Sequence, residues 1–566
     1  MNIHVLTANI RPLDINGNLE EYKKLAESIL DDGTIILPSL AFTGFNVLSM
    51  ASYSFFAQEN LKAVLKFAEH FKKKNNLFIL GGLLNYQDKT LNVHYFINKG
   101  KILNVSVNQN ALNQFDNFIG TEIIISKNNV KVLDNFNFNG QNFALAYAKR
   151  IEKNSIIIYP NDEKQLLNSG KLRIYNCELL SYEKESTVIS IGSGFYDSST
   201  SCLLNSDKII SKNGNLLKFS GTFDNENIIS ENCNITAEKT KPLYKNKTLT
   251  KDFFIPQNDR ECAEIFNIIT RGLSTRLKNT GIDCITLGMS GGSDSTLTLI
   301  AAVAAFKELN LDMKNLIAVT LPGFGTSSRT FDNSVALIKE LKVGYFNFDI
   351  KKSVKLHLKE LNHNKEDVVY ENAQARERTQ ILMDLANKHS GMMIGTGDMS
   401  EIALGFSTFG GDHLSMYCVN GNIAKTTVLA LLKYLSKISN NEIVKKCLFD
   451  VSETPISHEL KRDVLSETII GNYELNDYFL YKFITEKLSP KEIFEDAKKT
   501  LTHYTAEEIL HWLKSFLKRF VLSQFKRNCA CDSVQVFETC ISYNCFKMVS
   551  DASFSVFLKE LEDIKL

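Results

Sequence analysis

The sequence predicts an α/β protein made of two different parts, and three observations support this. Residues 1–235 alternate short β-rich runs with amphipathic helices, as in a layered α/β sandwich. From residue 258 onward, apolar runs alternate with helical segments in the order that gives a doubly wound parallel sheet. Between residues 284 and 300, an apolar run, a glycine loop and a helix follow one another directly.

Length and composition agree with two globular domains. A chain of 566 residues is too long for one ordinary domain, and its 44% hydrophobic content is enough for separate cores. Residues 233–250 are rich in Lys, Thr and Asn. We therefore expect a first domain at 1–235, a linker at 236–252 and a second domain at 253–566.

The charge balance argues against some partner classes. With 65 basic and 64 acidic residues, no long-range field favours a nucleic acid or a membrane. Residues 1–10 have neither a basic flank nor a cleavage site, and no stretch approaches the roughly 18 uninterrupted apolar residues of a spanning helix. We expect a cytoplasmic protein that binds neither nucleic acid nor membrane.

The 11 cysteines are expected to be thiols, because a chain of this length in a reducing compartment needs no disulfide framework. One cluster could also be a zinc site: Cys529, Cys531, Cys540 and Cys545. Its spacing fits no common zinc knuckle and no histidine joins it, which favours ordinary thiols.

In the first part, β-rich runs are predicted at 3–10, 34–37, 77–84, 94–107, 155–159, 172–175 and 187–191. Two helices are predicted from apolar residues at helical spacing. One apolar face consists of Leu19, Tyr22, Leu25, Ala26 and Ile29, and the other of Leu61, Val64, Leu65, Phe67 and Ala68.

In the second part, strands are predicted at 285–288, 316–321, 345–350 and 392–395. Helical segments separate them, so the strands should be parallel with right-handed crossovers. Ligands of such sheets bind at the carboxyl ends of the strands. The polar motifs of this part fall at or just after these ends.

The most distinctive motif is the glycine loop, with the sequence Gly288, Met289, Ser290, Gly291, Gly292, Ser293, Asp294 and Ser295. Glycines let a backbone turn its N–H groups inward, and the following helix offers its positive end, so the loop should hold a phosphate or pyrophosphate. It is not the common P-loop, because no lysine follows the glycines. The alternative is a plain turn in which Asp294 caps the helix.

Two further segments are candidates. The loop at 321–330 is predicted to cover a triphosphate, with Arg329 as a charge partner, and its alternative is a plain surface loop. The helix at 370–391 carries Asn372, Arg376 and Arg378 near its start. Arg and Glu runs are usually solvated faces, but the position of this one directly before the next motif favours a functional role.

The second part resembles a known family. SGGSDS resembles the pyrophosphate loop of the ATP pyrophosphatases, which split ATP between its α and β phosphates. ENAQARER, GTGDMSEIALGFSTFGGD, the Val-Asn pair and AKTT together resemble the NAD synthetase family, as far as SDAS near residue 550. GMP synthetase, asparagine synthetase and tRNA-modifying enzymes share only the first loop. The resemblance implies a doubly wound fold like that of the adenine nucleotide α-hydrolases.

This resemblance implies amidation of deamido-NAD. ATP would adenylate the nicotinate carboxylate, and ammonia would displace AMP to give NAD+, with Mg2+ neutralising charge in a water-poor pocket. The family motifs assign ATP to residues 288–295 and Thr396, and Mg2+ to Asp294 and Glu401. They assign deamido-NAD to Asn372, Glu401, Phe406, Ser407, Thr408, Phe409, Asp412 and Lys526. Asp294, Glu401 and Lys425 would be catalytic, although Lys425 and Lys526 could instead be surface charges.

The first part resembles the nitrilase family, in the glutaminase form of the long NAD synthetases. LTANI, TIILPSLAFTGF and LRIYNCELL carry this resemblance, which implies an α-β-β-α sandwich. The family's chemistry needs a glutamate base, an oxyanion-binding lysine and a nucleophilic cysteine. This chain offers Ser39 for the glutamate, Asn108 or Gln109 for the lysine, and Cys177 as the nucleophile.

We therefore expect a vestigial glutaminase. Serine is no base near neutral pH, and losing one oxyanion donor costs about a hundredfold to a thousandfold in rate. Cys177 would stay near the unperturbed thiol pKa of about 8.5. The alternative is a rearranged site that uses Glu178, Lys101 or Lys171, with full glutamine dependence.

Ammonia is the expected nitrogen donor, and the family resemblance also implies a homo-oligomer. Residues 528–549 depart from the family pattern, so no dinucleotide-binding role transfers there. A non-catalytic paralogue that only binds dinucleotide is the alternative of another class. The intact SGGSDS, GTGDMSE and AKTT motifs argue against it.

Overall fold

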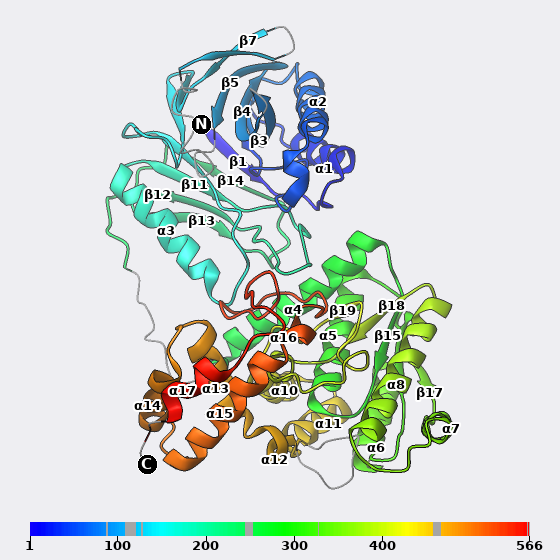
Figure 1. The fold of residues 1–566 in the computed structure, drawn as a ribbon. Helices are drawn as coiled ribbons and strands as arrows, with labels where there is room; N and C mark the ends of the chain where they lie inside the picture. Colours follow the sequence, from blue (N-terminus) through cyan, green and yellow to red (C-terminus); the bar gives the residue numbers. More distant parts are fainter. Residues whose placement is uncertain are drawn as a thin grey trace. The chain divides into compact units, whose positions relative to one another are not determined.

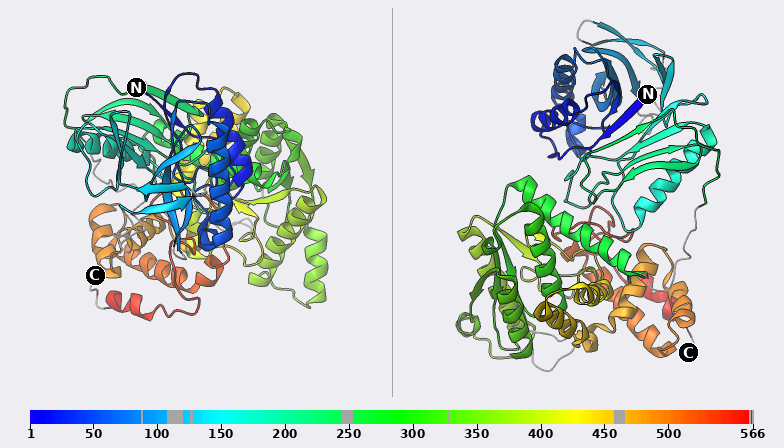
Figure 2. Two further views of the ribbon diagram at one scale, coloured as in Figure 1. Left: turned by 90° about the horizontal axis from the view of Figure 1, so that it is seen from above. Right: turned by 180° about the vertical axis from the view of Figure 1, so that it is seen from behind.

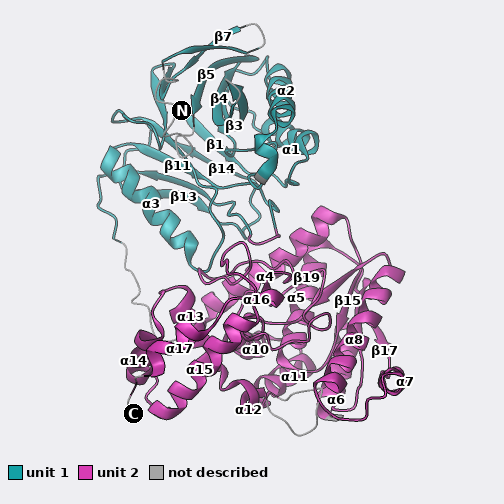
Figure 3. Ribbon diagram, in the orientation of Figure 1, with its two compact units in different colours: residues 1–198, 203–246 teal, residues 199–202, 247–566 magenta. Residues whose placement is uncertain are grey.

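The structure is a computed structural model that describes residues 1–86, 89–107, 120–125, 128–243, 253–326, 328–456, 466–562 and 564. It divides into two compact units (Figures 1 and 3). Unit 1 comprises Met1–Ser198 and Leu203–Asn246, and unit 2 comprises Ser199–Cys202 and Lys247–Leu566. Much of the predicted linker, residues 244–252, lies outside the described residues. The domain limits at 235 and 253 stay predictions.

Unit 1 contains two mixed β-sheets, in the strand orders β14-β1-β2-β3-β4-β5-β7-β6 and β13-β12-β11-β10-β9-β8 (Figure 1). The first sheet consists of β1 (Asn2–Leu6), β2 (Gly33–Ile36), β3 (Leu77–Tyr86), β4 (Lys89–Asn98), β5 (Lys101–Val107), β6 (Glu122–Ile125), β7 (Asn128–Val132) and β14 (Ile228–Asn232). The second consists of β8 (Asn135–Phe138), β9 (Gln141–Leu145), β10 (Ile156–Pro160), β11 (Thr187–Ile191), β12 (Lys208–Lys212) and β13 (Asn215–Ser220).

Helices cover the outer faces of both sheets. The helices α1 (Ile15–Glu27) and α2 (Ser54–His70) pack on the first sheet, with the short η1 (Leu48–Ser52) between them in the chain, and α3 (Ser169–Lys184) packs on the second. A separate core lies between the sheets and includes Ile3, Ile79, Phe96, Phe143, Ile158 and Ile189. These four layers confirm the predicted α-β-β-α sandwich.

The β-rich run predicted at 94–107 is confirmed as β-structure, in the form of a hairpin of β4 and β5 that turns at Lys99 and Gly100, both with positive φ. One of the predicted runs in unit 1 was wrong. The run at 172–175 lies inside α3. The buried residues of this helix, Arg173, Cys177 and Ser181, recur at every fourth position. That spacing is helical, and Leu172 lies 43% exposed.

Unit 2 is built on a five-stranded sheet in the order β17-β16-β15-β18-β19. Its strands are β15 (Ile285–Gly288), β16 (Leu316–Thr320), β17 (Gly344–Asn347), β18 (Met392–Gly395) and β19 (Tyr417–Cys418). All neighbouring pairs are parallel, which confirms the predicted doubly wound class. The chain order reverses at the β15–β18 pair, where such sheets bind ligands.

Helices surround this sheet (Figure 2). They are α4 (Asp259–Thr280), α5 (Ser293–Leu309), η3 (Met313–Asn315), α6 (Ser328–Leu341), α7 (Lys351–Glu360), α8 (Val368–Lys388), α9 (Met399–Leu404), α10 (Lys425–Ile438) and α11 (Glu442–Glu453). A carboxyl-terminal group, orange to red in Figure 2, contains α13 (Tyr473–Ile484), α14 (Pro490–Thr500), α15 (Ala506–Leu522), α16 (Gln524–Arg527) and α17 (Ser555–Glu562), preceded by α12 (Ser466–Ile470). Among the described residues, no helix is long and apolar enough to cross a membrane.

Candidate active site

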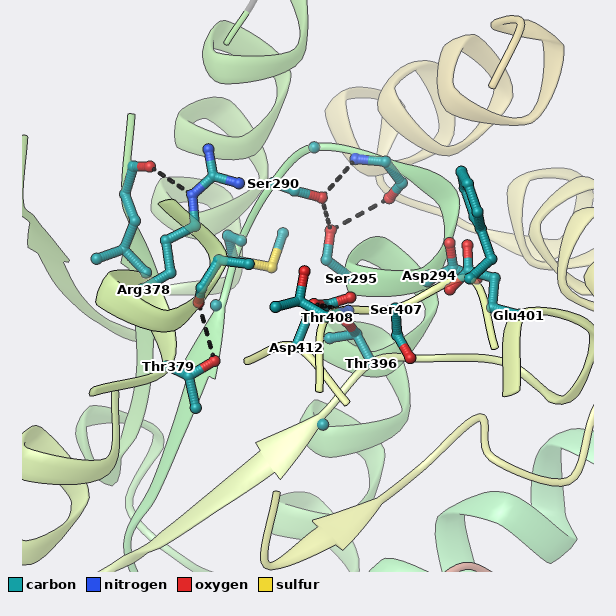
Figure 4. Close-up of a pocket in the computed structure, with 18 of the residues that line it drawn as sticks. Ser290, Asp294, Ser295, Arg378, Thr379, Thr396, Glu401, Ser407, Thr408 and Asp412 are labelled. Carbon is teal, nitrogen blue, oxygen red and sulfur yellow. Dashed lines mark hydrogen bonds between the residues drawn. The ribbon is translucent and has the colours of Figure 1, made fainter. Parts of the chain in front are cut away.

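A cavity of about 590 Å3 lies in unit 2 at the carboxyl ends of β15, β16 and β18 (Figure 4). Gly288, Thr320 and Gly395 end these strands and line it. Every residue that the sequence assigned to ATP or deamido-NAD also lines this cavity: residues 288–295, Asn372, Thr396, Glu401, residues 406–409, Asp412 and Lys526. The structure thus brings together motifs that lie up to 238 residues apart in the chain, from Gly288 to Lys526.

The glycine loop has a shape that its own hydroxyl groups fix. Ser290 Oγ accepts a bond of 3.2 Å from the Gly292 amide, and Ser295 Oγ donates one of 3.2 Å to the Gly292 carbonyl (Figure 4). Gly291 has a φ of +89°, and a Cβ there would lie 2.2 Å from the Thr330 carbonyl oxygen. Only glycine fits this position.

The first turn of α5 has no side-chain cap, since Gly292 is its N-cap residue. Asp294 therefore does not cap the helix, contrary to the alternative reading of the loop. The amides at a helix start have no partners within the helix, and the helix dipole there favours negative charge. Together with the loop they offer the N–H donors and the positive potential that suit a phosphate group.

Three carboxylates meet at one end of the cavity. Asp294, Asp398 and Glu401 each contribute an oxygen, and these atoms all lie within 4.8 Å of one another. The ammonium of Lys425 lies among them, at 2.6 Å from Asp294, 2.7 Å from Asp398 and 3.0 Å from Glu401. Lys425 is fully buried, so it is not the surface charge that was considered.

The electrostatics of this cluster follow from burial and mutual charge. Burial raises the pKa of Glu401 to about 7, against the opposing effect of Lys425. Burial also raises the pKa of Asp398. For Lys425, burial lowers the pKa, but the three carboxylates outweigh it and hold the pKa well above its usual value. Carboxylate oxygens are ligands that Mg2+ prefers, so Asp294 and Glu401, which face the cavity, fit a magnesium ion.

Asp398 was missed by the sequence reasoning. It is the N-cap residue of α9, and its side chain accepts a 2.9 Å bond from the Glu401 amide. The spacing Asp-x-x-Glu at the start of a helix could have indicated this, because it places both carboxyl groups at the same helix end.

The loop after α9 forms the other side of the cavity. Thr408 Oγ1 donates to Asn372 Oδ1 at 2.8 Å, and the Thr408 amide donates to Asp412 at 2.8 Å. Lys526 Nζ donates to the carbonyls of Gly405 at 2.8 Å and Ser407 at 2.5 Å, so its role is not that of a free surface charge. These bonds tie the loop to α8 and α16.

Phe409 is 45% exposed and lines the cavity. It stacks on His413 at 4.9 Å between ring centroids and lies 5.4 Å from Phe525. Such an exposed ring beside a cavity offers a flat apolar surface for a planar ligand group.

The arginines divide into two groups. Arg376 donates to the Phe409 carbonyl at 3.2 Å, and Arg378 donates to the Leu321 carbonyl at 3.1 Å. Both side chains line the cavity, so this face of α8 is not merely a solvent-exposed charged face. Arg329 instead pairs with Asp450 on α11. Its predicted role as a charge partner of the triphosphate has no support in this geometry.

The thiols of the cysteine-rich segment do not form one cluster with shared ligand geometry: Cys540 bonds to Cys545, while Cys529 and Cys531 have other partners. Cys529 Sγ lies 3.7 Å from His413 Nε2, whereas Cys531 Sγ accepts from the Ser415 amide at 2.9 Å. Cys540 lies by Ser542 at 3.2 Å. Within the described ranges, the group with metal-ligand geometry is the carboxylate cluster.

In unit 1, the structure corrects the place of Cys177. It lies on α3, not at the end of a strand, and it packs fully buried against Ile157, Val188 and Ile209. Its thiol donates toward the Val188 carbonyl at 3.8 Å. Burial raises the pKa of Cys177 to about 12, well above the near-normal value that was expected. The proposed lysine replacements, Asn108 and Gln109, lie outside the described residues.

The residues that directly follow β10 are Asn161 and Asp162. Ser39 bonds to Asp162, and Asn92 Nδ2 donates to Ser39 Oγ at 3.2 Å. Burial, reinforced by the charge of Asp197, raises the pKa of Asp162 to about 8. Ser39 thus bonds to Asp162 and Asn92, and Asp197 lies close enough to Asp162 to raise its pKa further.

Comparison with known proteins finds relatives of the carboxyl-terminal half. Residues 265–529 match the family model described as NAD synthase. Glutamine-dependent NAD(+) synthetase of Mycobacterium leprae is 34% identical over 313 residues, 49% of this chain and 46% of that protein. The enzyme of the same name from Aquifex aeolicus is 30% identical over 43% of this chain and 42% of its own length. The chain thus matches about half the length of these curated relatives.

Solved structures show the same fold over the whole chain. A glutamine-dependent NAD(+) synthetase from Cytophaga hutchinsonii has a TM-score of 0.79 at 16% identity, covering 100% of this chain and 99% of its own. One from Acinetobacter baumannii, in complex with ADP, has a TM-score of 0.63 at 18% identity, covering 96% and 98%. At these identities the likeness shows the fold alone.

Proposed function

We propose, from the match of residues 265–529 to the NAD synthase family, that this chain is an NAD synthetase. It would amidate deamido-NAD in the cytoplasm, with consumption of ATP and release of AMP and pyrophosphate. One observation carries the proposal: the phosphate loop, the carboxylates of Asp294 and Glu401, and residues 406–409 and 412 line a single cavity.

The geometry suits a reaction in two steps. In the first, a carboxylate oxygen of the nicotinate attacks the α-phosphorus of ATP, and pyrophosphate leaves toward the amides of residues 288–295. In the second, ammonia attacks the acyl carbon, AMP leaves, and a proton is lost. The cavity must exclude water in the interval, since water would hydrolyse the acyl-adenylate.

Individual residues would take up roles that follow from their positions. Thr396 and the loop at 288–295 would bind ATP, with the dinucleotide against Asn372, Phe409, Asp412 and Lys526. Asp294 and Glu401 would hold Mg2+, which when bound neutralises negative charge on the phosphates. Lys425 would act from behind these carboxylates, because it is buried and does not line the cavity.

Ammonia is the nitrogen donor in this proposal, because Cys177, the candidate nucleophile of unit 1, is not activated. The Cys177 thiol is buried, its pKa is raised to about 12, and Ser39 bonds to Asp162 and Asn92 instead of to a thiol. At neutral pH the thiol would be fully protonated, and a thiol attacks an amide only as thiolate.

The test compares nitrogen donors. Purified full-length protein receives ATP, Mg2+ and deamido-NAD, with either ammonium chloride or glutamine, and AMP and NAD+ are measured. We expect turnover with ammonium and none above background with glutamine. Asp294→Asn should abolish turnover with ammonium.

Two other outcomes are decisive. Absence of both AMP and NAD+ at ample ammonium would remove the proposed function. Turnover with glutamine would instead show a rearranged glutaminase, and its sensitivity to Asp162→Asn or Cys177→Ala would identify the residues in use.

A further inference from the structure

The carboxylate cluster already contains a cation, Lys425, whose three partners are not equivalent. Asp294 and Glu401 line the cavity, and their side chains are 18% and 22% exposed. The side chain of Asp398 is 0% exposed and lies behind them. A ligand in the cavity can therefore reach two of the carboxylates, while the third faces only the protein.

Asp398 is also held in place by its own helix. As the N-cap residue of α9, it accepts the Glu401 amide proton at 2.9 Å, while its other oxygen lies 2.7 Å from Lys425 Nζ. Turning toward the cavity would break both contacts. Asp398 is thus a fixed counter-ion, and Asp294 and Glu401 are the carboxylates that can exchange partners.

The charges indicate what the exchange partner is. Three carboxyl groups face one ammonium, so the acidic groups of the cluster outnumber its cations. A buried excess of this kind is costly unless it is paired. One divalent cation at Asp294 and Glu401 would cancel it.

We propose that Lys425 and a divalent cation share Asp294 and Glu401, and that Asp398 is the positioning residue that retains Lys425 when the cation binds. The inference rests on the proposed function only for the identity of the nucleotide that accompanies the cation. In physical terms, the ammonium of Lys425 and the bound metal ion compete for the carboxylates of Asp294 and Glu401.

Two substitutions should then shift metal affinity in opposite directions. Asp398→Asn keeps a helix cap but removes the fixed charge, so Lys425 holds Asp294 and Glu401 more firmly and metal binding weakens, by about tenfold or more. Lys425→Gln removes the internal competitor, so metal binding tightens even though the lysine's catalytic role is lost. If Asp398 and Lys425 only supported the local structure, both substitutions would weaken metal binding.

Asp477 on α13 provides a matched control. It is also buried, but its carboxylate accepts from Ser400 Oγ and from the Thr426 amide and hydroxyl, at 3.2 and 2.8 Å for the latter two. It forms no ion pair with Lys425 among the described residues. Asp477→Asn should lower the melting temperature and leave metal affinity within about threefold of the native value.

The measurement uses Mn2+ alone as the probe, with free Mn2+ followed by electron paramagnetic resonance on the full chain. Circular dichroism first checks folding, and Asp398→Ser, which also caps a helix, replaces Asp398→Asn if that variant does not fold. Native Mn2+ affinity in Asp398→Asn would overturn the inference. Weaker Mn2+ binding in Lys425→Gln would overturn it as well.

NAD+ formation provides a second readout, which separates the proposed function from the inference about the metal. In Asp398→Asn, NAD+ formation lost at low Mg2+ should recover when Mg2+ is raised. If native protein binds Mn2+ with the predicted changes in the variants but makes no NAD+, the proposed function fails and the inference stands. If NAD+ is made but the Mn2+ affinities do not move, the inference alone fails.

Discussion

Gly291 illustrates how a single residue can control the phosphate site. Its φ of +89° belongs to the left-handed region, and a Cβ would lie 2.2 Å from a backbone oxygen that cannot yield easily. Gly291→Ala should therefore displace the loop, raise the KM for ATP at least about tenfold and lower stability by about 1–3 kcal/mol. Steady-state kinetics and thermal unfolding measure both effects.

Gly397→Ala is the control for this prediction. A Cβ at Gly397 meets no heavy atom within 4 Å, so the substitution should have little effect on the KM for ATP. Equal effects of the two variants would show that the loop geometry at Gly291 is not what matters.

Cys177 should be chemically inert in the folded protein. It is 0% exposed and its pKa is raised to about 12, so neither access nor ionisation favours alkylation near pH 7. Iodoacetamide followed by peptide mass spectrometry should modify the exposed Cys529 and spare Cys177. Rapid labelling of Cys177 under native conditions would contradict the structure.

At the scale of elements, Asp162 lies just after β10 and bonds to Ser39, just after β2. Its carboxyl group makes the free energy of unfolding of unit 1 depend on pH. The pKa of Asp162 is raised from 3.8 to about 8, mainly by burial, so the folded state binds a proton that the unfolded state releases. The resulting stability is present below about pH 4 and is lost as the pH rises toward 8. Asp162→Asn should remove this part of the pH dependence.

The measurement is urea unfolding of the full chain at pH 5 and pH 8, in the native protein and the variant. We expect the loss of stability between the two pH values to be smaller in Asp162→Asn. An unchanged difference would show that Asp162 ionises normally in the folded protein.

The sequence was sufficient for the elements with regular patterns. The four predicted strands of unit 2 and the two helices packed on the first sheet of unit 1 are confirmed, since their apolar residues recur with strand or helix periodicity. β19 was missed because two residues, Tyr417 and Cys418, form no recognisable run. In α3, Leu172 and Tyr175 suggested a strand, although burial follows Arg173, Cys177 and Ser181.

The sequence identified those site residues that belong to recognisable motifs. The glycine loop and the GTGDMSE segment identified cavity residues, AKTT identified the lysine behind them, and the parallel topology explains why these segments meet. The burial of Lys425 could not be predicted, because it depends on three carboxylates that are brought together only by folding. The same holds for the contact between Ser39 and Asp162.

At the scale of the whole molecule, two units with their own cores predict two unfolding transitions. The cores of unit 1 and the sheet core of unit 2 share no residue among those described. A ligand that binds only the native state of one unit raises the transition of that unit. ATP with Mg2+ should therefore raise one transition, and Asp162→Asn should shift the other.

Differential scanning calorimetry of the full chain, with and without ATP and Mg2+, checks this prediction. A single transition that moves as a whole with ligand and with Asp162→Asn would show that the two units unfold together.

The ammonium of Lys425 also affects how the protein folds when no metal is bound. Sites whose ligands repel one another depend on their ion for folding, and chelators denature such proteins. Here an amino acid of the chain already offsets part of the repulsion, so the fold can assemble in the absence of metal. Exhaustive treatment with EDTA should stop catalysis and lower the melting temperature of unit 2 by only a few degrees, because the stabilisation by the bound ion is lost while the unit stays folded.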